Sequence, residues 1–592
     1  SLHSNSMGCC GHSRVESTSS LEEFRAPVNF SGPVQDRRCR DIIFLTIFCI
    51  FTVYMTCVVI AAASRGDYMR FTRGVDDFGN ICGQSNQGRK YADVPLSGQD
   101  MTGKPYMLVR YLNGRGKECV DSCPKDFIKT YFKICINSTF KGVFEKEHIP
   151  DVEAVADDIA SLYLEIIYMV LIGIGFTALF MVTLRFLAVF IVWFILGVTA
   201  IASTAACAVF WYQWDMKNKE LNKLPLLHEE RSLREKRLSY WLFAAVIATI
   251  FSAILILVLF IMRKRIKMVT ALFKEASVAL AAMPGLFLQP LLSSTCIIIS
   301  AILWLLGLVC IMAVGHPYLD KTFNVVKYAA DDFFVTMLPF YLLLFFWLAQ
   351  IILNSQLFVI ASSVSSWYFT RDKTHMKSPV MNGVRYLVFY HLGSIAFGSL
   401  IVACIKLLRA LVKAIEYSFK RRESEKVKIF ARIWEGMCQC IQKFLTYVNR
   451  NAFIIIAIHG YSFITSARRA FTLLAQHAMD VVAINSVGDF VLFLAKVAVT
   501  VFTMLCGIEI INQHQGVHYK WVPVFAGSIL TYFVADSCIS IYEMTIDTLF
   551  VCFCEDCEWN DGVTKPFFMT DTFKEFIEEG RRDRTTEPKQ FK

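Results

Sequence analysis

Long apolar runs recur along the whole chain, and they constrain its fold more than any other feature. A helix needs about 20 mostly apolar residues to cross the hydrocarbon core of a bilayer, and the sequence supplies about ten such runs. They are Ile42–Ala63, Leu162–Leu184, Leu187–Tyr212, Tyr240–Met262, Gly285–Val314, Phe333–Phe358, Tyr386–Leu411, Ala452–Ser466, Val487–Ile511 and Trp521–Phe550. The sequence therefore predicts an all-α, polytopic membrane protein with about ten transmembrane helices.

The overall composition agrees with this prediction. Of the 592 residues, 55% are hydrophobic and only 19% are charged, and the mean hydropathy is +0.47. A soluble chain could not bury so much apolar surface. The net charge of +10 does not indicate a nucleic-acid partner, because lysine and arginine collect on the cytoplasmic flanks of membrane helices.

Basic clusters set the predicted orientation. Arg37, Arg38 and Arg40 precede the first run, so the N-terminus is expected in the cytoplasm. The basic cluster at 263–267 follows the fourth run and is also expected in the cytoplasm, because four crossings return the chain to the side on which it starts. Met7 reads as the native start and residues 1–6 as a cloning remnant.

The first long polar segment, residues 64–161, is expected to be extracellular. It contains the sequon Asn137-Ser138-Thr139, a predicted glycosylation site. Its four cysteines are Cys82, Cys119, Cys123 and Cys135. An even number of cysteines outside the cell predicts two disulfides, with three connectivities open. A zinc site is disfavoured because no histidine lies at zinc-ligand spacing.

Three connections are less clear from the sequence. Only Arg185 and Phe186 separate the second run from the third, which predicts a tight helical hairpin. Lys267–Met283 is expected to form an amphipathic helix at the membrane interface. Tyr386–Leu411 and Ala452–Ser466 either both cross the membrane or are both re-entrant; we favour two crossings.

These predictions divide the chain into seven parts. They are a cytoplasmic tail (1–41), the first span (42–63), the extracellular loop (64–161), spans two to seven (162–411), a basic connecting helix of cytoplasmic type (412–451), spans eight to ten (452–550) and a cytoplasmic C-terminal tail (551–592).

Polar residues within the last run are the clearest candidate site. Tyr532, Asp536, Ser540, Glu543 and Asp547 recur at helical spacing and therefore share one face. Charged groups in hydrocarbon are costly and usually functional. A row of carboxylates is expected to line a cation pathway or to pair with protein cations. Tyr532, Asp536, Ser540 and Glu543 are predicted to contact the substrate.

The alternative for this row is a structural one. Lys496 lies well inside the ninth run, and it is expected to neutralise one of the carboxylates. If a carboxylate takes up a proton when the substrate leaves, Glu543 and Asp536 could couple transport to protons. His391 is a further candidate proton relay, although a hydrogen-bonded structural histidine is the alternative.

A second polar and aromatic stripe lies in the sixth run. Trp347, Gln350 and Asn354 share one face, and Trp304 lies centrally in the fifth run. Aromatic faces attract quaternary ammonium groups, so these four residues are further substrate-binding candidates. The alternative is that the tryptophans only fill the packing between helices.

Enzyme motifs are lacking. Gly98–Lys104 has the spacing of a phosphate-binding loop, but Pro105 replaces the required Ser or Thr. No zinc-protease, nucleophile-elbow or ATPase motif is found, and no metal or cofactor site is predicted. The sequence thus predicts no enzymatic activity, and any transport is expected to be driven by gradients.

Several short motifs resemble the choline transporter-like proteins, solute carrier family 44. They are Cys39–Asp41, Asn80–Gly83, Tyr390–Ser394, Tyr542–Phe550 and Cys552–Cys557. The resemblance extends over nearly the whole chain.

This resemblance implies a plasma-membrane carrier of choline and related small organic cations, with ethanolamine as a further substrate and proton exchange as the driving reaction. It also implies a mitochondrial pool, ten spans, cytoplasmic termini and a glycosylated first extracellular loop. Membrane lipids are the expected surroundings. A cation channel or a lipid scramblase-like protein remains the alternative function.

Overall fold

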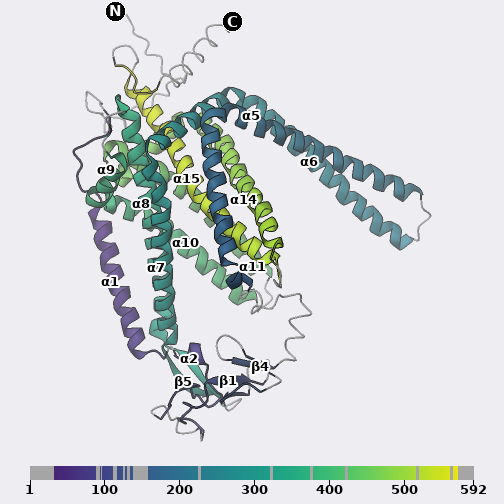
Figure 1. Ribbon diagram of the computed structural model, residues 1–592, viewed down its shortest axis with the longest axis vertical. Helices are drawn as coiled ribbons and strands as arrows, with labels where there is room; N and C mark the ends of the chain where they lie inside the picture. Colours follow the sequence, from purple (N-terminus) through teal and green to yellow (C-terminus); the bar gives the residue numbers. More distant parts are fainter. Residues whose placement is uncertain are drawn as a thin grey trace, which may run out of the picture.

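The computed structural model of the chain is a bundle of long helices with a small β-rich unit at one end (Figure 1). It describes residues 32–67, 69–87, 94, 96–110, 116–124, 127–129, 134–137, 158–223, 228–320, 325–373, 376, 378–420, 425–514, 519–560 and 565–570. The first 31 residues of the predicted N-terminal tail and the C-terminal tail from residue 571 lie outside these ranges.

The helices are α1 (Ile42–Arg65), α2 (Met69–Arg73), α5 (Tyr163–Lys223), α6 (His228–Ala282), η3 (Pro284–Phe287), α7 (Leu288–Ala313), α8 (Asp332–Phe369), α9 (Pro379–Tyr386), η5 (Leu387–His391), α10 (Leu392–Lys420), α11 (Glu425–His459), α12 (Phe463–Gln476), α13 (Ala478–Ala483), η6 (Ile484–Gly488), α14 (Asp489–Asn512) and α15 (Trp521–Trp559). The strands are β1 (Tyr106–Val109), β2 (Lys117–Val120), β3 (Phe127–Lys129), β4 (Ile134–Asn137), β5 (Gly315–Asp320) and β6 (Val325–Ala330).

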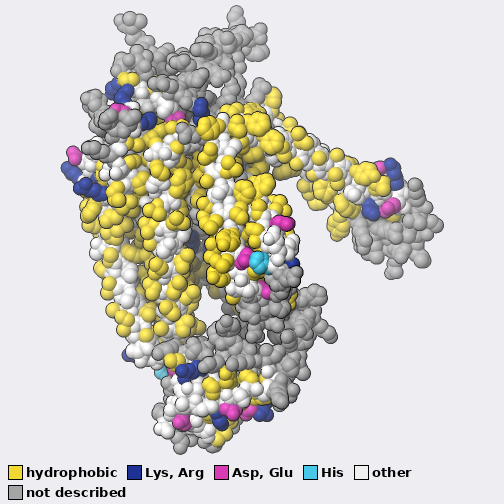
Figure 2. Space-filling view, in the orientation of Figure 1, with side chains coloured by type: hydrophobic (Ala, Val, Ile, Leu, Met, Phe, Trp, Pro, Cys, Tyr) yellow, Lys and Arg dark blue, Asp and Glu magenta, His cyan; other side chains and the backbone are white. Residues whose placement is uncertain are grey.

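Within the described ranges, nine helices are long and apolar enough to cross a membrane. Their outward side chains are largely hydrophobic (Figure 2). Large apolar residues such as Ile201 and Phe533 are more than 60% exposed. A soluble protein would not tolerate such a surface, whereas lipid solvates it. The predicted all-α polytopic membrane fold is confirmed.

The predicted sharp turn between the second and third runs is present, but the two segments do not pack side by side as a hairpin (Figure 1). Both runs are candidate membrane spans, Tyr163–Leu184 and Val189–Leu221, and a kink at Leu187 (φ −119°, ψ 20°) separates them within α5. Residues 185–188 contain neither glycine nor proline, and the two segments follow one another without a loop. Beyond the bend, α5 pairs with α6, and the two project from the bundle as an arm (Figure 1).

Helix α11 returns along α10. Lys413 on α10 pairs with Glu435 on α11 at 2.9 Å, and Asn449 donates to the carbonyl of Gly398 at 2.7 Å. Residues progressively earlier in α10 thus meet residues later in α11, which makes the two helices antiparallel. The predicted connecting segment 412–451 is therefore split between the end of α10 and most of α11.

The predicted eighth span, Ala452–Ser466, is not one helix. Residues 452–458 form the fully buried last two turns of α11. The chain then turns at Gly460, whose φ of +68° favours glycine, and continues as α12. These buried turns contribute to a large core cluster with the final turns of α8 and α15.

The segment predicted as an interfacial amphipathic helix is the last part of α6. Its apolar side chains, among them Phe273 and Leu280, are buried in the same core cluster. Protein therefore covers the apolar face that an isolated interfacial helix would place in lipid.

The two ends of the described chain meet at one end of the bundle. Gly32 and Phe568 both lie against Phe369, the last residue of α8. The first residue of α8, Asp332, follows strand β6 at the far end of this 38-residue helix. The β-rich unit and the chain ends consequently lie at opposite ends, as the predicted orientation requires (Figure 1).

Two disulfides hold the β-rich unit together, as predicted. They join Cys82 to Cys119 and Cys123 to Cys135, one of the three connectivities that the sequence allowed. The four-stranded sheet has the order β2-β1-β4-β3, which places Cys119 on β2 and Cys135 on β4, on either side of β1. The backbone of Asn137 pairs with Phe127, but its side chain and Ser138-Thr139 lie outside the described part.

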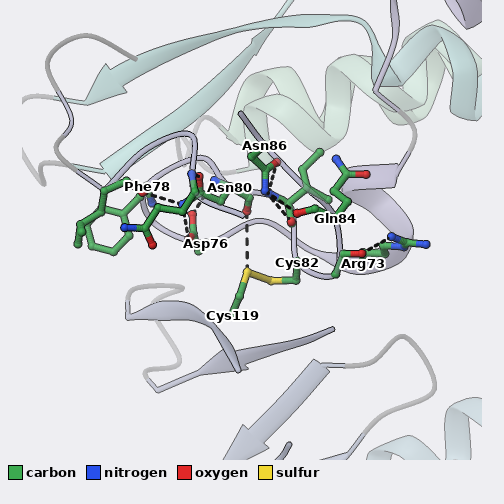
Figure 3. The surroundings of a disulfide bond; sticks show 12 residues. Arg73, Asp76, Phe78, Asn80, Cys82, Gln84, Asn86 and Cys119 are labelled. Carbon is green, nitrogen blue, oxygen red and sulfur yellow. Dashed lines mark hydrogen bonds between the residues drawn. A yellow bond between two sulfur atoms is a disulfide. The ribbon is translucent and has the colours of Figure 1, made fainter. Parts of the chain in front are cut away.

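Asn80 organises the loop before the first disulfide (Figure 3). Its side chain is fully buried and donates to Asp76 and to the carbonyl of Leu96, both at 2.9 Å. Its oxygen accepts the amides of Gly98 and Gln99. A buried amide with each of its groups paired fixes one loop conformation. The Asn80–Gly83 motif therefore has a structural role next to Cys82.

Candidate functional site

The carboxylate row of α15 faces two other helices, α11 and α14. The guanidinium of Arg450 on α11 lies 2.5 Å from Glu543 and 2.7 Å from Asp547. Arg450 comes only two residues before the fully buried turns of α11, so this helix carries a cation deep into the bundle. A guanidinium can bond two carboxylates at once because its donors form a planar fork.

A second ion pair lies two turns along the same row. The ammonium of Lys496 on α14 is 2.6 Å from Asp536, as the sequence predicts. The lysine side chain is 13% exposed, whereas that of Asp536 is 46% exposed. Asp536 is therefore the more accessible member of the pair.

A fourth carboxylate, Asp489 at the start of α14, joins this group. It interacts electrostatically with Glu543, Asp547 and Arg450. The ionic cluster, defined here as Arg450, Asp489, Lys496, Asp536, Glu543 and Asp547, thus holds two more carboxylates than cations. In a membrane interior such a surplus needs a proton or a positive guest.

The other two residues of the predicted row border this cluster. Tyr532 and Ser540 are both partly buried, and the ring of Tyr532 lies edge-on to Phe533. Their position four residues before and after Asp536 keeps them on its helical face. The structure thus brings the predicted α15 residues together, with Arg450 as the partner that the sequence did not identify.

The predicted aromatic candidates lie in other helix interfaces. Trp304 on α7 stacks on Tyr341 and Phe345 of α8, with ring centroids 5.9 Å and 4.8 Å apart. Its indole nitrogen donates to the carbonyl of Tyr341. In this conformation the ring joins two helices.

Trp347 has a comparable position between α8, α10 and α1. It is 2% exposed, donates to the carbonyl of Ala396 at 2.9 Å and lies edge-on to Phe48. Asn354, also on α8, donates to Ser399 of α10 at 2.9 Å. Gln350, which lies between Trp347 and Asn354 in the sequence, is buried as well. The structure does not join this stripe to the ionic cluster, and its substrate-binding role stays a prediction.

His391 is also remote from the ionic cluster. It is fully buried, and its Nε2 lies 3.2 Å from the guanidinium of Arg37. Arg37 also donates to the carbonyls of Ile456 and Ala457 at the end of α11. Burial lowers the pKa of this arginine to about 10. The pair ties the N-terminal segment to the bundle, and proton relay by His391 stays a prediction.

A cavity lies on a different face of α15. It has a volume of about 740 Å³ and is lined by residues of α5, α6, η3, α7 and α15. Ser537 and Tyr542 line it, but none of the carboxylates of the ionic cluster does. The predicted carboxylate row therefore has protein partners and does not face this cavity.

Comparison with known proteins was made on the whole chain. The family model described as "Plasma-membrane choline transporter" matches residues 246–558, more than half of the chain and including all of the ionic cluster. Choline transporter-like protein 1 of Torpedo marmorata is 29% identical over 97% of both chains. The protein of the same name from Mus musculus is 28% identical over 97% of this chain and 96% of its own. Choline transporter-like protein 2 of Dictyostelium discoideum is 27% identical over 92% and 96%.

Proposed function

Because the chain belongs to the plasma-membrane choline transporter family, we propose that it carries choline across the plasma membrane as a gradient-driven secondary transporter. Ethanolamine is proposed as a second substrate and the proton as the exchanged ion. The observation that carries this proposal is the ionic cluster between α11, α14 and α15, with its two surplus carboxylates.

A quaternary ammonium group has no N–H to donate, so only its charge and its methyl groups can be recognised. Carboxylates attract the charge over several ångströms when water is scarce. In the proposed cycle, choline takes the place of Arg450 beside Glu543, or of Lys496 beside Asp536. The exposed side of Asp536 makes it the first carboxylate that an entering cation meets.

Proton exchange follows from the same charge balance. When choline leaves, the cluster regains its surplus negative charge, and a carboxylate in a water-poor site then binds a proton more readily. One proton returning for each choline released keeps the charge of the cluster constant. Glu543 and Asp536 are the proposed proton acceptors, because both lie on the substrate-facing row.

The test is uptake of radiolabelled choline into proteoliposomes that contain the purified protein. We expect saturable, temperature-dependent uptake that increases when the interior of the vesicle is made more acidic than the bath. Uptake no greater than in protein-free vesicles would refute the proposal. Non-saturable uptake would instead favour a channel, and movement of labelled phospholipid between leaflets without choline uptake would favour a scramblase.

A further inference from the structure

The cavity beside α15 has walls without charge. Of its lining residues, the polar ones carry hydroxyl groups or a thiol, and none is an acid or a base; they are Thr177, Ser277, Ser294, Ser537, Cys538 and Tyr542. The remaining lining residues are apolar. An isolated cation would lose its hydration here without an ionic partner, so this cavity is distinct from the proposed choline site.

The cavity opens sideways between membrane-spanning helices. Leu291 of α7 and Phe533 of α15 line it and are each 62% exposed, and Val182 of α5 is 55% exposed. These three helices contain candidate membrane spans. Hydrophobic side chains cover the outer surface of α5 and α7 (Figure 2). The opening of the cavity consequently faces the lipid bilayer.

One end of this lateral groove has a positive charge nearby. Lys274 lies one helical turn before Ser277 on the same face of α6, and it is exposed. In the described part of the chain it forms no ion pair. Helix α7 ends next to β5, so η3 and the end of α6 lie at the opposite, predicted cytoplasmic, end of the bundle.

We infer that the lateral groove binds one acyl chain of an anionic phospholipid, with the negatively charged headgroup next to Lys274. An apolar wall matches the hydrocarbon chain, and a long lysine side chain can reach the headgroup level. Anionic lipids are enriched in the cytoplasmic leaflet and attract basic residues near the surface. This site is independent of the proposed choline transport.

Photocrosslinking tests the site directly. The full-length protein is placed in nanodiscs with phosphatidylserine that carries a diazirine in its acyl chain, and labelled peptides are identified by mass spectrometry. We expect the label to concentrate on the peptides that contain Leu291 and Phe533. Even labelling of all lipid-facing helices would overturn the inference.

Two neighbouring substitutions on α5 separate the groove from ordinary lipid contact. Ala178 lines the groove, whereas Leu179 is 61% exposed and does not line it. Ala178→Trp is expected to reduce labelling of the Leu291 and Phe533 peptides about tenfold, since filling an occupied space costs on the order of 1.4 kcal/mol or more. Leu179→Trp should leave the labelling unchanged; an equal effect of both substitutions would contradict the site. If Ala178→Trp is not monodisperse, Ser294→Phe blocks the groove from α7 instead.

The headgroup is tested by the lipid preference. Wild-type protein should favour the phosphatidylserine probe over its phosphatidylcholine counterpart, and Lys274→Glu should reduce this ratio about fivefold, as expected for one lysine near an anionic surface. Equal labelling by both probes in the wild type, or an unchanged ratio in the variant, would refute the preference for an anionic headgroup next to Lys274. Labelling of the groove only by a sterol or fatty-acid probe would overturn the phospholipid assignment.

Discussion

The ammonium of Lys496 lies 2.6 Å from the carboxylate of Asp536, and the two side chains join α14 to α15 within the membrane-spanning part of the bundle. Each charge would be costly in hydrocarbon by itself. The pair therefore specifies which faces of the two helices meet, in addition to any role in transport.

Removing one partner of this pair should cost more than removing both. Lys496→Met leaves Asp536 without its cation, and the melting temperature of the purified protein should fall. We expect the loss of stability to be smaller than for a fully buried pair, where it is about 3–5 kcal/mol, because the Asp536 side chain is 46% exposed. Lys496→Met with Asp536→Leu should recover most of the loss. A double variant less stable than the single one would contradict a structural pairing.

Arg37 should stabilise the end of the bundle where the chain ends meet. Its guanidinium donates to the carbonyls of Ile456 and Ala457 in the last turn of α11, and the carbonyl of Ile456 also accepts the amide of Gly460. Arg37→Ala should therefore destabilise the protein by about 1–3 kcal/mol, the cost of unsatisfied buried polar groups. Thermal unfolding monitored by gel filtration measures this change. Arg38→Ala is the matched control, because Arg38 is exposed; equal effects of the two variants would refute the assigned role.

The two disulfides should contribute unequally to the β-rich unit. Cys82 and Cys119 are 37 residues apart, whereas Cys123 and Cys135 are 12 apart. In the chain-entropy account, closing the longer loop stabilises by about 4 kcal/mol and the shorter one by about 3 kcal/mol. Hydrogen exchange of residues 96–110 should thus increase more in Cys82→Ser/Cys119→Ser than in Cys123→Ser/Cys135→Ser. The reverse order would show that this loop does not depend on the first disulfide.

Hydropathy and helical period predicted most of the architecture. The length of each apolar run identified the spans. Because an α-helix has 3.6 residues per turn, the spacing of Asp536 and Glu543 placed both on one face. Lys496 was identifiable as a partner since it is a lone cation deep in a span.

Arg450 could not be identified in this way. Its helix begins with many charged residues, so it resembles a cytoplasmic connector, and hydropathy does not show that it turns back along α10. The direction that the chain takes after Leu187 was missed for a related reason. Hydropathy locates an apolar run but not the direction in which the next one leaves.

The disulfide connectivity could not be predicted from the sequence either. Four cysteines allow three pairings, and only the folded arrangement of their segments brings Cys119 near Cys82 and Cys135 near Cys123.

Choline uptake by Glu543→Gln, compared with Glu435→Gln, tests the central claim most directly. Both glutamates pair with a cation across a helix interface, and both side chains are 27% exposed, but only Glu543 belongs to the ionic cluster. We predict that Glu543→Gln lowers uptake into proteoliposomes by about tenfold or more, equivalent to about 1.4 kcal/mol, and weakens its dependence on the proton gradient. Glu435→Gln should transport as the wild type does. Uptake by Glu543→Gln that matches Glu435→Gln in rate and in proton dependence would contradict the account.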